Sequence, residues 1–586
     1  MSIGGCRMSR IETNKQKRIK MPFIILGLLF SVVLISTSLF LLLYPFPSKE
    51  KALFTNKEHP IIFEGKIYGE EAQIIDGTVY LPFSFVKENI DDAVIIDDAT
   101  NSIIFTTKDK VLQMPSDSLT YLVNEEPFNV EVPIYLSSEG QSLMSLEPLK
   151  TLFPVKWDYS EETGAVIVRK QGETIIRGIV NKGLQEDKLR LRTDPDVTTA
   201  YVGEVVGNEI IEIVEEDRNF YYVRKDNGIS GYLKKDSITL SNTEIVKVEN
   251  EISQKYRPDI SWPINLTWEA VYSANPDTKK LPQMPGVNVV SPTWFHLKNN
   301  EGDISNLGSA DYMKWAKSRN YQVWGLFSND FDPEKTYQAL KDYETRMKMI
   351  RQLLQYSEMY QLDGINIDIE NVNLADGPLV TQFVREATPY FHQAGLIVSM
   401  DVTFISGSDT WSRFYEREKL ASVVDYMMVM AYDEHWGTSP VPGSVASLPW
   451  VESNLQKLLE VVPNDRLLLG IPLYSRIWKE QETDGGNIEV SSKAYSMQAI
   501  NDWVSERNLT PIYDEASGQN YVEYLDEAEK ATYKIWIEDE ASLQKRAQLV
   551  HKYQLAGVAT WSRFFANDAG WATIDDSLKQ IDATDK

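Results

Sequence analysis

The stretch Gly364-Ile-Asn-Ile-Asp-Ile-Glu370 alternates apolar and polar side chains. Successive side chains of an extended strand point to opposite faces, so Asn366, Asp368 and Glu370 share one face and the isoleucines share the other. In a parallel barrel the outer face is covered by helices, which places the isoleucines outside and this polar column inside. Two enclosed carboxylates could perform general acid and base chemistry. A structural network of buried carboxylates is the alternative to a catalytic site.

The elements that would position this column begin at residue 258. Eight β-like runs alternate there with longer helical stretches: 264–268, 287–291, 321–325, 364–370, 396–401, 426–432, 467–472 and 557–561. They predict an α/β fold, a (β/α)8 TIM barrel over residues 258–586, with its chemistry at the carboxyl ends of the strands. A doubly wound sheet is the alternative, but no glycine-rich phosphate loop follows any of these runs.

The polar column lies within Asp363-Gly-x-Asn-x-Asp-x-Glu370, which resembles the D-G-x-D-x-D-x-E signature of glycoside hydrolase family 18, the chitinase family. Three later stretches are similar to further motifs of this family, in the same order: Met430 to Asp433, Gly470 to Arg476, and Trp561. Asn366 departs from the signature, which usually has aspartate there. Asparagine at this place is familiar in the branch of the family that acts on bacterial cell walls and spore cortex.

This resemblance implies a retaining, substrate-assisted glycosidase, in which the 2-acetamido oxygen of the sugar attacks the anomeric carbon. Glu370 would protonate the leaving oxygen and later deprotonate water, and Asp368 would orient the acetamido group and offset the charge of the oxazolinium. The resemblance implies no metal and no cofactor. It implies further substrate contacts from Asn366, Met430, Tyr432, Asp433, Tyr474, Arg476 and Trp561. Because Asn366 removes one like charge, we expect Asp368 to ionise more readily than in a column of three carboxylates.

Weaker candidates lie near the ends of other predicted strands. Asp401 and Glu269 could line the cleft, with capping or ion pairing as the alternative. His435 lacks the neighbours that a metal site needs. Four tryptophans could stack on sugars, although for each one we expect packing between strand and helix: Trp268, Trp294, Trp324 and Trp478.

The first 50 residues indicate where the barrel acts. Basic residues in 1–20 precede an apolar run from Met21 to Tyr44, and a membrane crossing needs about 20 such residues. We predict a transmembrane helix over residues 21–44, a cytoplasmic tail over 1–20, and the remainder outside the cell membrane. A long cleaved signal peptide is the alternative. Cys6 is the one cysteine, so no intrachain disulfide is expected.

Small β-rich modules are predicted between the apolar run and the barrel. Residues 58–171 repeat the order strand, short helix, strand, hairpin, strand, and resemble copper amine oxidase N-terminal-like modules, without a metal site. Residues 172–241 resemble a bacterial SH3-like domain, and residues 242–257 read as a linker. Such modules could contact the cell wall or act as spacers.

The net charge of −26 should repel nucleic acid, which excludes a polyanion-binding role. The resemblance to glycoside hydrolase family 18, together with the predicted anchor, implies a membrane-anchored glycosidase outside the cytoplasm that hydrolyses β-1,4-linked N-acetylglucosamine glycans, either peptidoglycan or a chitin-like polymer. A non-catalytic, lectin-like wall protein is one alternative. Another makes wall attachment by the front modules the main role.

Overall fold

The computed structural model describes residues 21–43, 46–138, 140–248, 260–483 and 486–579. The predicted tail 1–20 with Cys6, and residues 249–257 of the predicted linker, lie outside the described residues. The chain forms two compact units, one of residues 1–82 and 149–250, the other of residues 83–148 and 251–586.

The second unit contains a closed barrel of eight parallel strands, in the order β22-β21-β35-β29-β28-β27-β26-β25, which β22 closes by pairing with β25. Every predicted run forms one of these strands, so the barrel prediction is confirmed and the doubly wound alternative is wrong. The strands are β21 Ile264–Glu269, β22 Val289–Pro292, β25 Gln322–Ser328, β26 Gly364–Asp368, β27 Ile397–Thr403, β28 Tyr426–Met430, β29 Leu467–Pro472 and β35 Gly557–Trp561.

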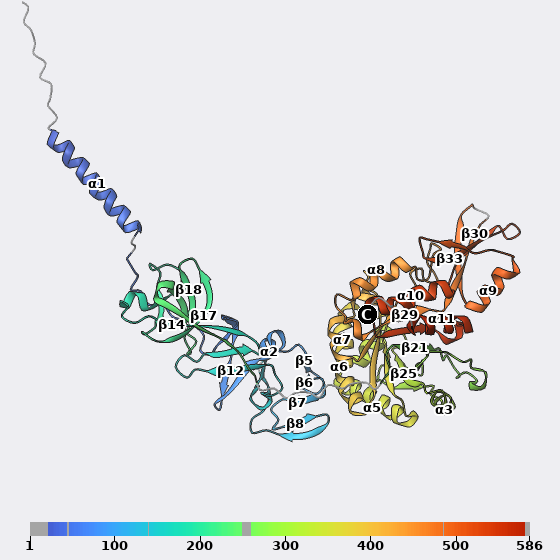
Figure 1. The fold of residues 1–586 in the computed structure, drawn as a ribbon. Helices are drawn as coiled ribbons and strands as arrows, with labels where there is room; N and C mark the ends of the chain where they lie inside the picture. Colours follow the sequence, from blue (N-terminus) through green and yellow to red (C-terminus); the bar gives the residue numbers. More distant parts are fainter. Residues whose placement is uncertain (1–20, 44–45, 139, 249–259, 484–485, 580–586) are drawn as a thin grey trace, which may run out of the picture. The chain divides into compact units, whose positions relative to one another are not determined.

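Helices surround the barrel (Figure 1). Ile365, Ile367 and Ile369 are buried in the apolar layer between strands and helices, as their alternation predicted. The polar column therefore faces the interior. The helices of the barrel are α3 Ala310–Ser318, α4 Pro333–Leu340, α5 Tyr343–Tyr360, α6 Gly377–Gln393, α7 Arg417–Val423, α8 Leu448–Leu458, α10 Glu540–Tyr553 and α11 Asp568–Lys579.

An insertion between β29 and β35 was not separated from the barrel by its sequence. It is a five-stranded antiparallel sheet, in the order β31-β30-β34-β33-β32, with helix α9 Met497–Glu506 and an apolar core of its own (Figure 1). Its strands are β30 Tyr474–Glu482, β31 Ile488–Ser496, β32 Ile512–Asp514, β33 Gln519–Asp526 and β34 Ala531–Ile537.

Residues 83–148 share a core with the barrel, although they belong to the predicted module 58–171. Ile104 and Val111 join the main apolar cluster of the barrel, and the buried Asp97 accepts a hydrogen bond from Tyr343 N of α5 at 2.8 Å. The segment contains α2 Phe83–Asn89 and a sheet in the order β5 Val94–Asp97, β6 Ser102–Thr106, β7 Val111–Pro115, β8 Thr120–Val123, β9 Glu126–Asn129, followed by the hairpin β10 Tyr135–Ser138 and β11 Gln141–Met144.

The first unit holds the rest of that module and the predicted SH3-like domain. The repeat that the sequence predicts within residues 58–171 runs through both units. Its first copy is β4-α2-β5-β6 and its second copy is β11-η1-β12-β13, with η1 at Glu147–Leu149. The module strands of this unit are β1 Pro60–Phe63, β2 Lys66–Glu71, β3 Gln73–Ile75, β4 Thr78–Pro82, β12 Val155–Tyr159 and β13 Val166–Lys170.

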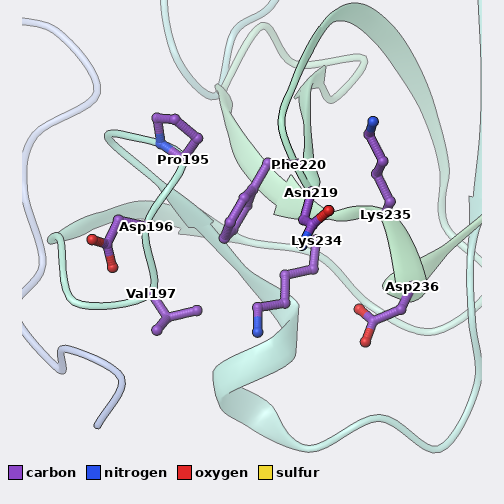
Figure 2. Close-up of a pocket in the computed structure, with 8 residues that line it drawn as sticks. All are labelled: Pro195, Asp196, Val197, Asn219, Phe220, Lys234, Lys235 and Asp236. Carbon is purple, nitrogen blue, oxygen red and sulfur yellow. The ribbon is translucent and has the colours of Figure 1, made fainter. Parts of the chain in front are cut away.

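The predicted SH3-like region is a seven-stranded sheet in the order β16-β15-β19-β18-β17-β14-β20. A pocket of about 450 Å³ opens on it, and Phe220 forms one wall between Asp196 and Lys234 (Figure 2). The SH3-like identity stays a prediction. The strands are β14 Thr174–Val180, β15 Arg190–Arg192, β16 Tyr201–Glu204, β17 Ile210–Asp217, β18 Phe220–Arg224, β19 Ser230–Lys234 and β20 Ile238–Ile245.

Helix α1 runs over Met21–Leu43, within the predicted transmembrane segment 21–44. A crossing needs about 20 apolar residues, and the side chains that the structure describes in α1 are those of residues 25–40. Within the described part of the chain, no helix is both long enough and apolar enough to cross a membrane. The transmembrane prediction is therefore not confirmed.

Candidate active site

A cavity of about 1000 Å³ opens at the carboxyl ends of the barrel strands. Two of the predicted site residues, Asn366 and Arg476, lie behind its wall and contact lining residues. Asp401, a weaker candidate, also lines the cavity. The other predicted site residues line it: Asp368, Glu370, Met430, Tyr432, Asp433, Tyr474 and Trp561.

The two predicted catalytic carboxyl groups are enclosed, and each has a raised pKa. Burial raises the pKa of Asp368 to about 7, and its Oδ1 has no hydrogen-bond partner. Burial, reinforced by the charges of Asp368 and Asp433, raises the pKa of Glu370 well above its ordinary value. Burial therefore favours the protonated form of Glu370, whereas Asp368 changes charge near neutral pH.

Three hydrogen bonds hold the backbone at the end of the column. Asn329, which follows β25 and is buried, accepts from Glu370 N at 3.0 Å and donates to Glu370 O at 2.7 Å. Its amide also donates to Thr336 Oγ1 at 2.8 Å. Tyr415 Oη donates to Ile369 O at 2.9 Å. These contacts position Glu370 beyond the last paired residue of β26, and the sequence analysis missed Asn329 because no spacing rule connects it to the column.

Asn366 connects the column to the next strand. Its Oδ1 accepts from Trp268 Nε1 at 2.9 Å and from Ser291 Oγ at 3.0 Å, and its Nδ2 donates to Asp401 Oδ1 at 2.9 Å. The expectation that Asp368 ionises more readily here than in a column of three carboxylates stays a prediction. Burial dominates the pKa of Asp368, and Asp401 supplies a third carboxyl group to the same interior.

The motif residues after β28 and β29 meet at the opposite wall. Tyr474 Oη donates to Asp433 Oδ1 at 2.7 Å, and Arg476 Nη2 reaches the same oxygen at 3.3 Å. Asp433 has a positive φ of 59°, a conformation that turns the chain at this point. Its carboxylate is thus balanced by a cation, in contrast to the carboxyl groups of the column.

Aromatic side chains form most of the apolar lining. Trp268 and Trp561 lie with ring centroids 6.0 Å apart beside the carboxyl groups. Trp411 and Trp436 are 44% and 52% exposed at the cavity mouth, where they could stack on sugars beyond the centre. The sequence analysis missed both, although each follows a predicted strand within about ten residues.

The other weak candidates take the structural alternatives. Glu269 forms an ion pair with Arg563. His435 Nδ1 contacts Ser444 O at 3.0 Å. The indoles of three tryptophans are buried and bonded to protein atoms away from the cavity: Trp294, Trp324 and Trp478. No group of metal-binding side chains occurs among the residues that the structure describes.

Comparisons with known protein families match two ranges of the chain. The family Glycosyl hydrolases family 18 matches residues 272–566, and the Copper amine oxidase N-terminal domain matches residues 63–168. The glycosylase YvbX of Bacillus subtilis is 25% identical over 304 residues, which are 50% of this chain and 85% of that protein.

Two further proteins are similar over the barrel. The cortical fragment-lytic enzyme of Bacillus subtilis is 23% identical over 265 residues, 45% of this chain and 60% of that enzyme, so less than two thirds of it has a counterpart here. A chitinase structure from Chromobacterium violaceum superposes with a TM-score of 0.48 at 20% identity, covering 54% of this chain and 100% of that one.

Proposed function

Because the chain belongs to family 18 of the glycosyl hydrolases, we propose that its barrel hydrolyses β-1,4-linked glycans that contain N-acetylglucosamine, with substrate assistance and retention. The observation that carries this proposal is the pair Glu370 and Asp368. Both face one cavity, and burial raises the pKa of each.

The two carboxyl groups suit different steps of that reaction. The raised pKa of Glu370 favours its protonated form, which can transfer a proton to the leaving oxygen. Asp368 ionises near neutral pH, so it can carry a negative charge when the acetamido oxygen attacks and positive charge develops on the sugar. Trp561 offers an apolar surface under the ring, and Tyr432 and Asp433 can hold the acetamido group.

A non-catalytic, lectin-like role is the competing function. Two observations disfavour this role. The chain keeps a glutamate at residue 370, and burial raises the pKa of that carboxyl group, which glycan binding alone does not require.

The test replaces Glu370 by glutamine, which preserves shape and removes the acid. We expect release of reducing ends from N-acetylglucosamine oligomers to fall by about 1,000-fold or more, consistent with loss of general acid catalysis and charge stabilisation together. Glu334→Gln, at an exposed position of α4, is the control and should match the wild type. Wild-type binding without cleavage would support the lectin, and full activity of Glu370→Gln would refute the mechanism.

For the natural substrate we propose a bacterial wall glycan. The asparagine at 366 and the similarity to a cortical fragment-lytic enzyme support it. Purified protein incubated with peptidoglycan and, separately, with chitin oligomers should release N-acetylglucosamine-terminated fragments faster from peptidoglycan, as read by mass. Faster cleavage of chitin would overturn this choice.

We propose further that the barrel acts outside the cytoplasm and that the modules of the first unit contact the wall. The support is the basic segment 1–20 before the apolar run, together with the pocket at Phe220, where lysines and aspartates mix as a zwitterionic peptide would require (Figure 2). Digestion of the barrel by protease added to intact cells tests the location. If the protease digests the barrel only after the cells are lysed, the proposed location is refuted.

A further inference from the structure

Asp401 brings a carboxyl group into the active-site cavity from β27, a strand that carries none of the family motifs. In the register of β26 and β27, Ile367 pairs with Met400, so Asp368 and Asp401 are the next residues on the two strands. Paired residues of a sheet direct their side chains to the same face. Both line the cavity, and Asp401 is only 2% exposed.

The hydrogen bonds of Asn366 fix how its amide meets Asp401. The amide oxygen is already occupied by Trp268 Nε1 and Ser291 Oγ, so the amide nitrogen must face the carboxyl group, which it does at 2.9 Å. Neutral donors such as this amide offset only part of the cost of a buried negative charge. The bridge therefore positions Asp401 without making its ionised form stable.

The groups that face Asp401 offer it no counter-ion. Burial and the charges of Asp368 and Glu370 raise the pKa of Asp401 well above its ordinary value, and the Asn366 amide and the Trp268 indole oppose this only in part. No cation acts on these three carboxyl groups among the residues that the structure describes. Asp433 acts on Glu370 as a further negative charge. The remaining titratable neighbours are Tyr415 and Tyr432, whose own pKa values are raised by burial, and Arg417 beside Tyr415, whose Nη1 and Nη2 donate to carbonyl and hydroxyl oxygens.

We propose that Asp401 is a positioning residue that stays protonated and leaves the negative charge of the site on Asp368. The inference rests on the proposed function. Three neighbouring carboxyl groups without a cation cannot all ionise. Glu370 must hold a proton to act as the acid, and Asp368 must be charged to balance the sugar intermediate. Asp401 is the group left to stay neutral.

Two substitutions separate this role from an inert or an ionised aspartate. Asp401→Asn imitates the neutral acid and keeps an acceptor for the Asn366 amide, so kcat should stay within about 5-fold of the wild type. Asp401→Ala removes the polar neighbour of Asp368. We expect kcat to fall by about 100-fold, with KM changed by less than about 3-fold, and the acid limb of kcat to move up by about one pH unit, because an apolar neighbour raises the pKa of Asp368 further.

Ser399→Ala is the matched control, because Ser399 lies two residues earlier on the same face of β27, is buried, and has no hydrogen-bond partner for its hydroxyl. It should leave kcat and the pH profile unchanged. A merely structural role of Asp401 would lower the thermal unfolding temperature of Asp401→Ala without moving the acid limb.

An infrared measurement keeps the proposal testable where Asp401→Ala does not fold. The difference spectrum of wild type minus Asp401→Asn at neutral pH should contain the carbonyl band of a protonated carboxyl group. Absence of that band, loss of activity in Asp401→Asn, or a folded Asp401→Ala with wild-type kcat would each overturn the proposal. If the wild type cleaves no glycan, the proposed function is refuted. The infrared spectrum then still tests whether Asp401 is protonated.

Discussion

Replacing Asp368 by asparagine should abolish activity and, at neutral pH, stabilise the fold. Burial holds the pKa of Asp368 at about 7 in the folded protein, above the ordinary value of 3.8. The folded state therefore binds this proton more tightly than the unfolded chain does. The stability that this group contributes is complete below about pH 4 and is lost as the pH rises to about 7. Asparagine carries no charge and escapes that loss.

The size of the gain follows from the same shift. The difference between 3.8 and about 7 is roughly three pKa units, and at about 1.36 kcal/mol per unit the buried charge costs at most about 4 kcal/mol above pH 7. The amide adds N–H groups beside a position where Oδ1 has no partner, which costs about 1–2 kcal/mol. We expect a net gain of about 2–3 kcal/mol at pH 8 and a loss of about 1 kcal/mol at pH 4.

Scanning calorimetry of the full chain measures this, with the barrel transition followed at about pH 4 and pH 8. The unfolding temperature of Asp368→Asn should exceed that of the wild type at the higher pH and fall below it at the lower. Asp502→Asn, at an exposed position of α9, should change neither. An equal shift at both pH values would refute the reasoning, because a packing effect does not depend on the charge.

Further predictions concern other parts of the site and its support. Asn329→Ala should lower kcat by about 100-fold with little change in KM, since the backbone of Glu370 loses two hydrogen bonds; Thr336→Val, which leaves both bonds in place, should keep kcat. Ile104→Asp should lower the unfolding free energy of the barrel by about 3 kcal/mol or more in urea titrations, since that side chain lies in the shared core. Trp436→Ala should raise KM for long oligomers more than for short ones, if its exposed ring stacks on a distant sugar.

The barrel and the polar column could be predicted from the sequence because both follow from local periodicity. Alternation with a period of two assigned the isoleucines of residues 364–370 to the helix side, and the structure buries them there. The insertion after β29 could not be separated, because its short strands and α9 repeat the same alternation of β-like and helical stretches as the barrel.

Contacts across strands were beyond that reasoning. The sequence treated Asn366 as the loss of a carboxyl neighbour, because only residues of the same strand could be compared. Asp401 lies on the next strand, and its place beside Asp368 follows from a register that no local pattern contains. Likewise nothing in residues 97 or 104 indicated that they pack on α5 and its neighbours.

A last prediction concerns the contact in which Asn366 of β26 has an amide and Asp401 of β27 has a carboxyl group. Asn366→Asp alone places a fourth carboxyl group against Asp401 and removes the amide donor, so we expect loss of more than about 3 kcal/mol of stability at neutral pH. Adding Asp401→Asn restores a donor and an acceptor at the same contact, while Trp268 and Ser291 still donate to residue 366. The double variant should therefore recover most of the stability and activity, which chemical unfolding and a double-mutant cycle measure. Additive losses in the cycle would show that Asn366 and Asp401 act independently, and that a carboxyl group on either strand cannot serve the same cavity.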